Sequence, residues 1–174
     1  MNSCFLLRLT RFFILLFVQV LVCNHIHLFN YITPLVIGYM VVCFRRNASR
    51  TGMLLWGFSI GLLFDMFSNT AGMAAASCTL IAMIQPAMLA MFTPHDAEDD
   101  FTPSILSLGF WNYTFYVFLL MLVLHGVFYL LDAFTLADGV LTILSIVGGA
   151  TLTTVIIIGI ELLVRSNKRR KDYD

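Results

Sequence analysis

The chain has 174 residues, of which 60% are hydrophobic and 11% are charged, and its mean hydropathy is +0.91. A soluble domain is about half apolar and a quarter charged, so this composition excludes a soluble globular domain as well as a disordered chain. Four cysteines also exclude a disulfide-rich secreted scaffold, and the balance of ten basic against ten acidic residues gives no net charge to interpret. The composition predicts an integral membrane protein.

Six apolar segments are candidates for transmembrane helices, each of which needs about 20 residues. They cover residues 12–29, 31–44, 52–67, 72–92, 112–131 and 140–164. The connections are short, so the sequence predicts a single all-α domain, a bundle of six transmembrane helices. The second and third segments are short, and the sequence leaves open whether they span a locally thinned bilayer or are partly re-entrant.

The basic residues gather on one side of this predicted bundle. They are Arg8, Arg11, Arg45, Arg46, Arg50, Arg165, Lys168, Arg169, Arg170 and Lys171. With six spans all of them fall on the same side, and the three loops of the other side carry no Lys or Arg. Because cytoplasmic loops are enriched in Lys and Arg, the sequence predicts that both termini are cytoplasmic. We expect the basic tail to contact anionic lipid.

Asp65 is the most informative residue, because an acidic side chain inside a span is costly and usually faces the bundle interior. Gly57, Gly61 and Asp65 are spaced by four and share one helix face, on which the two glycines let another helix approach closely. The sequence thus predicts a packing face that ends in a carboxylate. Asp65 is either a ligand or proton site or, as we favour, a buried acid that caps a neighbouring helix or loop.

Other small residues spaced by four lie in the fourth and sixth predicted segments. They are Gly72 with Ala76, Ala74 with Cys78 and Ala82, and Ser145 with Gly149 and Thr153. This spacing predicts either close packing inside the bundle or a face kept for a partner helix, and both alternatives stay open.

His125 is a second ionisable side chain well inside a span. Counted from the predicted cytoplasmic ends, it and Asp65 lie at similar depths of about 20 Å, so we hypothesise a buried Asp65–His125 pair. The alternative is a histidine that bonds to a helix carbonyl. Near the cytoplasmic end of the sixth segment, Glu161 precedes Arg165 by four residues, which favours a helical ion pair.

No motif in the sequence indicates catalysis or a cofactor. The chain has no Walker loop, no HExxH and no nucleophile motif, so we expect no enzyme. His25 and His27 are two positions apart and therefore point apart on a helix, and the cysteines are scattered, so we expect no metal site. The acidic run from His95 to Asp100 is either a solvated loop or a docking surface for a basic partner.

The third and fourth segments carry a pattern that resembles the rod shape-determining protein MreD family. The pattern consists of Gly57, Phe58, Gly61, Leu62, Leu63 and Asp65, followed after six intervening residues by Gly72 and a helix of small residues. The chain length, the six predicted spans and the basic loop before this pattern are similar to that family too. One departure is Leu35, because many members carry an acidic residue directly after the proline that stands here as Pro34.

The resemblance implies a non-catalytic subunit of the cell-elongation (rod) complex in the bacterial inner membrane, with a role in peptidoglycan synthesis and cell shape. MreD-like proteins associate with the bitopic membrane protein MreC and, through it, with MreB, RodA and the elongation transpeptidase. No nucleic-acid partner is implied. The family fold is similar to the substrate-binding subunits of energy-coupling factor transporters.

That similarity supplies an alternative function, a small-ligand-binding subunit of such a transporter. A subunit of this kind needs a pocket with several convergent polar groups under its outer loops. The predicted outer half of this chain offers few of them, chiefly Asp65, Asn69 and His125.

Overall fold

The computed structural model describes residues 34–93, 101–132 and 139–171, with side chains described as far as Leu163. This part of the chain is mostly helical and contains no strand. Four of its helices are long and apolar enough to cross a membrane. They are α3 (Arg50–Ser68), α4 (Met73–Phe92), α6 (Phe110–Asp132) and α7 (Gly139–Lys171), the spanning stretch of α7 being Gly139–Leu163.

These helices cover the third to sixth predicted segments. α3 extends beyond the predicted 52–67 at both ends, and its 19 residues rise about 28 Å, close to the thickness of the hydrocarbon core. The third segment therefore needs neither a thinned bilayer nor a re-entrant path. The predicted first segment, 12–29, lies outside the described residues, as does the whole of the acidic run 95–100.

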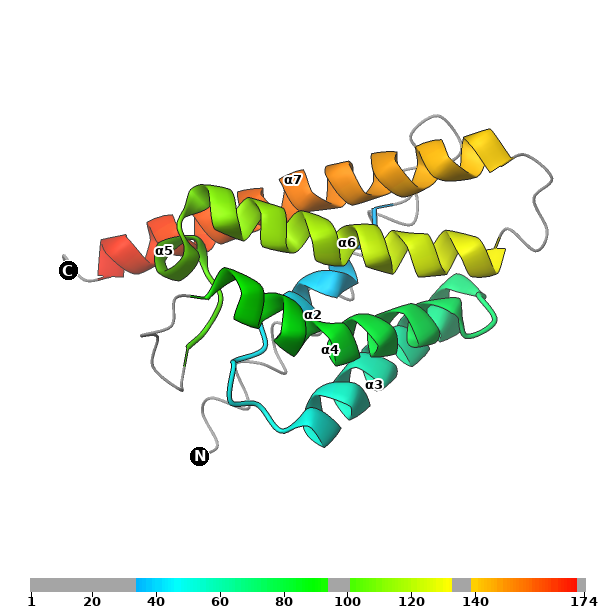
Figure 1. Ribbon diagram of the computed structural model, residues 1–174, viewed down its shortest axis with the longest axis horizontal. Coiled ribbons are helices and arrows are strands. Elements are labelled where there is room, and N and C mark those ends of the chain that lie inside the picture. Colours follow the sequence, from blue (N-terminus) through cyan, green and yellow to red (C-terminus); the bar gives the residue numbers. More distant parts are fainter. Residues whose placement is uncertain (1–33, 94–100, 133–138, 172–174) are drawn as a thin grey trace.

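The four long helices lie side by side in the order α3, α4, α6, α7, and each runs antiparallel to the next (Figure 1). α4 therefore separates α3 from α6. The start of α3, the end of α4, the start of α6 and the end of α7 meet at one end of the molecule, where the short helix α5 (Ile105–Leu108) leads into α6. We call this the basic end, because the Arg45–Arg50 loop precedes α3 there and the Lys- and Arg-rich tail ends α7 there.

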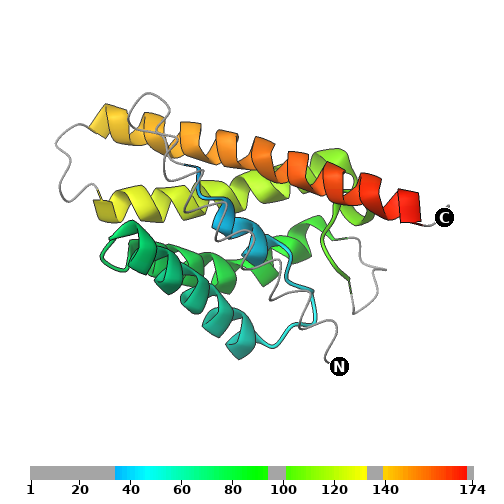
Figure 2. The same ribbon diagram turned by 180° about the vertical axis from the view of Figure 1, so that it is seen from behind.

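A short helical stretch lies among the long helices, as the views from both sides show (Figure 2). It consists of the 3-10 turn η2 (Val36–Gly38) and the single turn α2 (Tyr39–Val42). These seven residues rise only about 10–12 Å, so the described part of the predicted second segment does not cross a bilayer.

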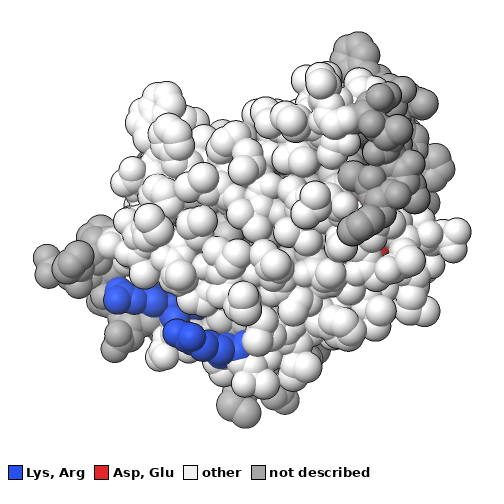
Figure 3. Space-filling view, turned by 45° about the vertical axis from the view of Figure 1, so that its right-hand side comes forward, with Lys and Arg blue, Asp and Glu red and all other residues white. Residues whose placement is uncertain are grey.

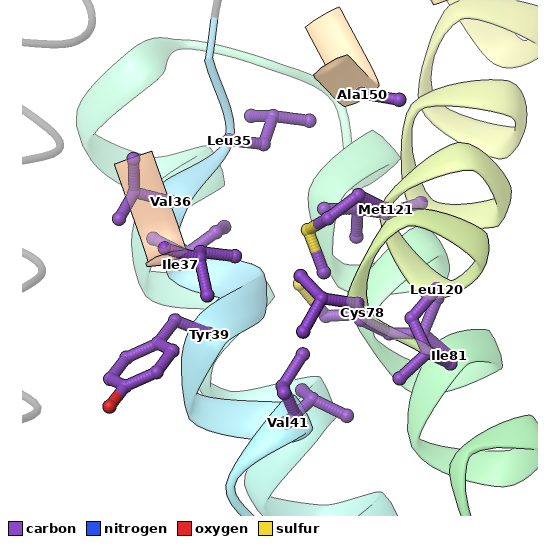
Figure 4. Packing of buried hydrophobic residues seen from close by; sticks show 14 of the residues in the cluster. Leu35, Val36, Ile37, Tyr39, Val41, Cys78, Ile81, Leu120, Met121 and Ala150 are labelled. Atoms are coloured by element: carbon purple, nitrogen blue, oxygen red, sulfur yellow. The ribbon is translucent and has the colours of Figure 1, made fainter. Parts of the chain in front are cut away.

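The residues of this stretch are buried except for the half-buried Met40, which is the pattern of a helix largely enclosed by protein. Ile37 and Val41 point toward Cys78 of α4 and Met121 of α6, whereas Tyr39 points the other way (Figure 4). Packing against α4, α6 and α7 therefore makes η2 and α2 the centre of the described core.

The outer faces of the long helices expose large apolar side chains. Examples are Leu55, Phe58, Met66, Met83, Phe115, Leu144 and Val155. So much exposed apolar surface is unfavourable in water but suits contact with lipid, in agreement with the composition.

Candidate functional site

The contact between α3 and α4 is close because α3 has no side chain where α4 approaches it. A Cβ atom at Gly57 would lie 2.8 Å from the carbonyl oxygen of Cys78 and 2.9 Å from the Cβ of Ala82. A Cβ atom at Gly61 would collide with backbone atoms of Ala74 and Ala75. The glycine face of α3 is thus filled by the neighbouring helix of the same chain, as close packing inside the bundle requires.

Asp65 continues this face and binds the first turn of α4. Its Oδ1 accepts from the main-chain N–H of Ala74 at 3.0 Å, and its Oδ2 accepts from that of Ala75 at 2.9 Å. The hydroxyl of Thr70 also donates to Oδ1. These N–H groups have no partner within their own helix, and a negative charge at a helix N-terminus is favourable, so the buried carboxylate caps α4.

Two left-handed residues shape the turn that brings α4 back onto α3. Asn69 ends α3 with φ 55°, and Gly72 precedes α4 with φ 80°. Asn and Gly are the residues that tolerate this conformation best. Gly72, the last glycine of the pattern, therefore allows the left-handed backbone conformation that the turn before α4 requires.

Gly72 and Ala76, predicted as a packing pair, are not part of the α3–α4 contact. A Cβ atom at Gly72 would meet nothing within 4 Å, and Ala76 is exposed. The α4 residues that do face α3 are Ala74, Ala75, Cys78 and Ala82. Spacing by four shows that two residues share a face of α4. It does not show which face of α4 packs against α3.

His125 is fully buried between α6 and α7. Its Nδ1 lies 2.9 Å from the carbonyl oxygen of Met121, which can only accept, so Nδ1 carries a proton and donates it to this bond. Nε2 lies 3.3 Å from Oγ1 of Thr153, which itself accepts from the main-chain N–H of Leu35 at 3.2 Å. Gly149 leaves room for the imidazole ring, so the predicted small face of α7 packs against α6.

The structure does not bring Asp65 and His125 together. The hydrogen bonds of the Asp65 carboxylate go to the α3–α4 turn and to α4, and those of His125 go to Met121 and Thr153. The reason is helix order, because α4 lies between the helices that carry the two residues. Similar depth along two helices does not make them neighbours.

The ends of the short α2 are held by side chains that the sequence analysis did not single out. Nε2 of Gln85 donates to the carbonyl of Phe44 at 3.2 Å and to the hydroxyl of Tyr116 at 2.8 Å. The Tyr116 hydroxyl donates to the carbonyl of Val42 at 3.3 Å. Helix C-terminal carbonyls need such partners when they are buried. A glutamine inside an apolar segment was the available signal.

Tyr39 and Glu161 tie the same stretch to α7. The Tyr39 hydroxyl donates to Oε2 of Glu161 at 2.8 Å, and this bond joins residues more than a hundred positions apart. The predicted partner of Glu161, Arg165, has a side chain outside the described part. Two atoms near this region, the Tyr113 hydroxyl and Oε1 of Gln85, are buried without a hydrogen-bond partner among the described atoms.

The described basic side chains gather at one end of the molecule. They are Arg45, Arg46 and Arg50, and they lie along one edge (Figure 3). Among the described acids, Asp65 and Asp132 lie near the opposite helix ends, whereas Glu161 lies toward the basic end of α7. Over the described residues, no group of three His, Cys, Asp or Glu side chains is placed to hold a metal ion.

Fold and side-chain arrangement together define a helical multi-pass membrane protein whose buried polar groups hold backbone groups of neighbouring segments. Comparison with protein-family models, with curated proteins and with solved structures finds no match to this chain.

Proposed function

We propose that the chain is a non-catalytic membrane subunit of the bacterial cell-elongation (rod) complex, similar to MreD, which binds an MreC-like bitopic protein. Through that partner it joins MreB, RodA and the elongation transpeptidase and helps organise peptidoglycan synthesis. It acts by docking of helix faces in the membrane plane, where close packing and interhelical hydrogen bonds supply the affinity.

The observation that carries the proposal is the arrangement of the α3–α4 hairpin. The residues that resemble the MreD pattern act here as one structural unit. Gly57 and Gly61 admit α4, Asp65 caps it and Gly72 forms its left-handed entry. This gives a physical reason for a pattern of two glycines, an acid and a later glycine at this spacing.

The same pattern also contains residues that the hairpin does not use. Phe58 and Leu62 are 47% and 42% exposed, and both lie on the outer face of α3. We assign this face to the partner helix. A side chain that faces lipid contributes little to the fold, so its substitution separates docking from folding.

The finer features of the fold belong to the same proposal. We propose the six spans predicted from the sequence, of which η2 and α2 form the described part of the second, with both termini in the cytoplasm and a bundle similar to energy-coupling factor substrate-binding subunits. The gathering of basic residues supports the orientation, because the described arginines and the basic tail share one end of the helices.

The test is affinity purification of the tagged full-length chain from its own membranes in mild detergent, followed by mass spectrometry. Recovery of a single-span coiled-coil protein together with RodA or the transpeptidase is the expected result. Recovery of paired ATPases with a second membrane subunit instead overturns the proposal in favour of the transporter alternative.

A matched pair of variants locates the docking face. The double variant Phe58→Ala/Leu62→Ala is expected to accumulate at the wild-type level. The amount of partner that is purified with it is expected to fall to less than half. Leu144→Ala, at an equally outward position on α7, is the control and is expected to recover the partner at the wild-type level. Equal recovery by both variants contradicts the assignment of the α3 face.

A further inference from the structure

Two polar atoms near the end of α2 are buried without a hydrogen-bond partner among the described atoms. They are Oε1 of Gln85 and the hydroxyl oxygen of Tyr113, and both side chains are fully buried. Buried polar atoms in proteins are almost always paired with another protein group or with ordered water. Each of the two atoms therefore needs a partner that the described side chains do not supply.

The two atoms have opposite requirements. Nε2 of Gln85 donates to the carbonyl oxygen of Phe44, which can only accept, so this bond fixes the orientation of the amide and leaves Oε1 in need of a donor. The Tyr116 hydroxyl accepts from the same Nε2 but cannot be that donor, because its one proton goes to the carbonyl of Val42. The Tyr113 hydroxyl has an unused proton and so needs an acceptor.

Side chains of three helices bring polar atoms together at this place. Gln85 of α4 lies 2.8 Å from the Tyr116 hydroxyl, and the ring centroids of Tyr113 and Tyr116 on α6 are 6.5 Å apart. The Tyr113 hydroxyl interacts electrostatically with Tyr116 and with the carboxylate of Glu161 on α7. Oε2 of Glu161 accepts from Tyr39, which leaves Oε1 of this carboxylate as a further acceptor.

A ligand that both donates and accepts meets these requirements. A cation would bind Oε1 of Gln85 but would leave the proton of Tyr113 unpaired, whereas an anion would do the reverse. A water molecule accepts from Tyr113, donates one proton to Gln85 and has a second proton for Glu161. Three hydrogen bonds are typical of a buried water.

From this arrangement we infer that Gln85, Tyr113 and Glu161 bind a water molecule that joins α4, α6 and α7. The inference does not rest on the proposed function. Loss of the Tyr113 hydroxyl is expected to change stability little, because the entropy regained by the released water offsets the lost hydrogen bond.

The water site lies close to the membrane surface. Tyr113 is three residues from the start of the spanning stretch of α6, and Glu161 is two residues from the end of that of α7. Both residues therefore lie within about 5 Å of the ends of these stretches along their helices. Glu161 is only half-buried, so water reaches the site from the basic end.

Hydroxyl-radical labelling by X-ray pulses tests for this water. The radicals form from water molecules, so a buried side chain is oxidised only when water lies beside it. The full-length chain is irradiated in detergent, and mass spectrometry measures the oxidation of each residue relative to the denatured chain. We expect about fivefold more oxidation at Tyr113 than at Met121, which is fully buried in the apolar core further along α6, because apolar interiors stay dry (Figure 4).

The variant Tyr113→Phe shows whether the hydroxyl holds the water, because it keeps the ring and removes only the polar atom. Oxidation at position 113, again relative to the denatured chain, is expected to fall to less than half of the wild-type value. Oxidation at Met121 is expected to stay unchanged, which serves as the control for altered packing of α6.

Three outcomes overturn the inference. Oxidation of Tyr113 no higher than that of Met121 means that the hydroxyl finds its partner within the chain and no water is bound. Equal oxidation of position 113 in the wild-type chain and in the Phe variant means that the hydroxyl does not hold the water. Suppression of the oxidation by sodium chloride but not by choline chloride at the same concentration means that the site takes a cation.

Discussion

Gly61 illustrates how a single hydrogen atom decides the packing of two helices. Its missing side chain lets the backbone of α4 come so close that even a methyl group collides with Ala74 and Ala75. Because the obstacle is main chain rather than a flexible side chain, it cannot move aside without displacing the helix.

We predict that Gly61→Ala destabilises the protein by about 1–3 kcal/mol, because the two helices must separate. The matched control is Gly126→Ala on α6, where a Cβ atom meets nothing within 4 Å and the better helix propensity of Ala is expected to be neutral or slightly stabilising. Thermal unfolding of both variants in detergent, followed by loss of the monodisperse peak in size exclusion, measures the difference. Equal melting temperatures contradict the prediction.

Asp65 uses both carboxylate oxygens as acceptors, which distinguishes it from an amide. Asp65→Asn keeps one acceptor but turns an NH₂ group toward one of the two α4 N–H donors, so one buried N–H loses its partner. We predict a loss of about 1–3 kcal/mol for Asp65→Asn and a larger loss for Asp65→Ala, measured by the same melting experiment. An Asn variant as stable as the wild-type protein shows that the cap is not needed.

At the scale of elements, the short α2 depends on its neighbours. A single helical turn is not stable by itself, and its buried carbonyls require partners from outside the helix. Gln85 of α4 and Tyr116 of α6 supply them, while Thr153 of α7 accepts from Leu35 at the other end. Three long helices thus fix one short one, which in turn fills the space among them.

Two buried tyrosines one turn apart on α6 test this arrangement. Tyr116→Phe removes the donor to Val42, and we predict a loss of about 1–3 kcal/mol because that buried carbonyl is left unpaired. Tyr113→Phe removes a hydroxyl that has no partner among the described atoms, so it is expected to be neutral or stabilising. Melting temperatures of the two variants measure the difference. Equal melting temperatures contradict the proposed role of Tyr116.

At the scale of the whole molecule, the antiparallel order of the helices brings separate basic segments to one end. The Arg45–Arg50 loop and the tail after Leu163 are far apart in sequence. They lie at the same end because the chain between them runs through four antiparallel long helices, an even number. Because Lys and Arg are enriched on the cytoplasmic side of membrane proteins, this charge supports the proposed orientation.

We predict that the α3–α4 turn faces away from the cytoplasm. In a background without the native cysteines, Ala71→Cys is expected to react with a membrane-impermeant maleimide on intact cells, because it lies in the exposed turn. Asn47→Cys, exposed in the basic loop, is expected to react only after the membrane is permeabilised. The reverse labelling pattern contradicts the proposed orientation.

The parts of the site that sequence predicted well are local. Gly57, Gly61 and Asp65 share a face by helical spacing alone, and an acid within an apolar run needs a buried partner. The hydrogen bonds of Gln85 and the bond between Tyr39 and Glu161 were not predicted, because they join segments up to 122 residues apart along the chain. The Asp65–His125 hypothesis failed for the same reason, since it required knowing which helices are neighbours.

By itself the sequence determined that this is a helical membrane protein, where the four long apolar helices of the described part lie and which residues gather at its basic end, because hydrophobicity, helical period and charge act along the chain. Only the tertiary structure decided which small faces meet, what Asp65 binds and how α2 is held. In lipid all apolar faces are nearly equivalent, so steric fit and the pairing of buried polar groups, both properties of helices brought together, select the arrangement.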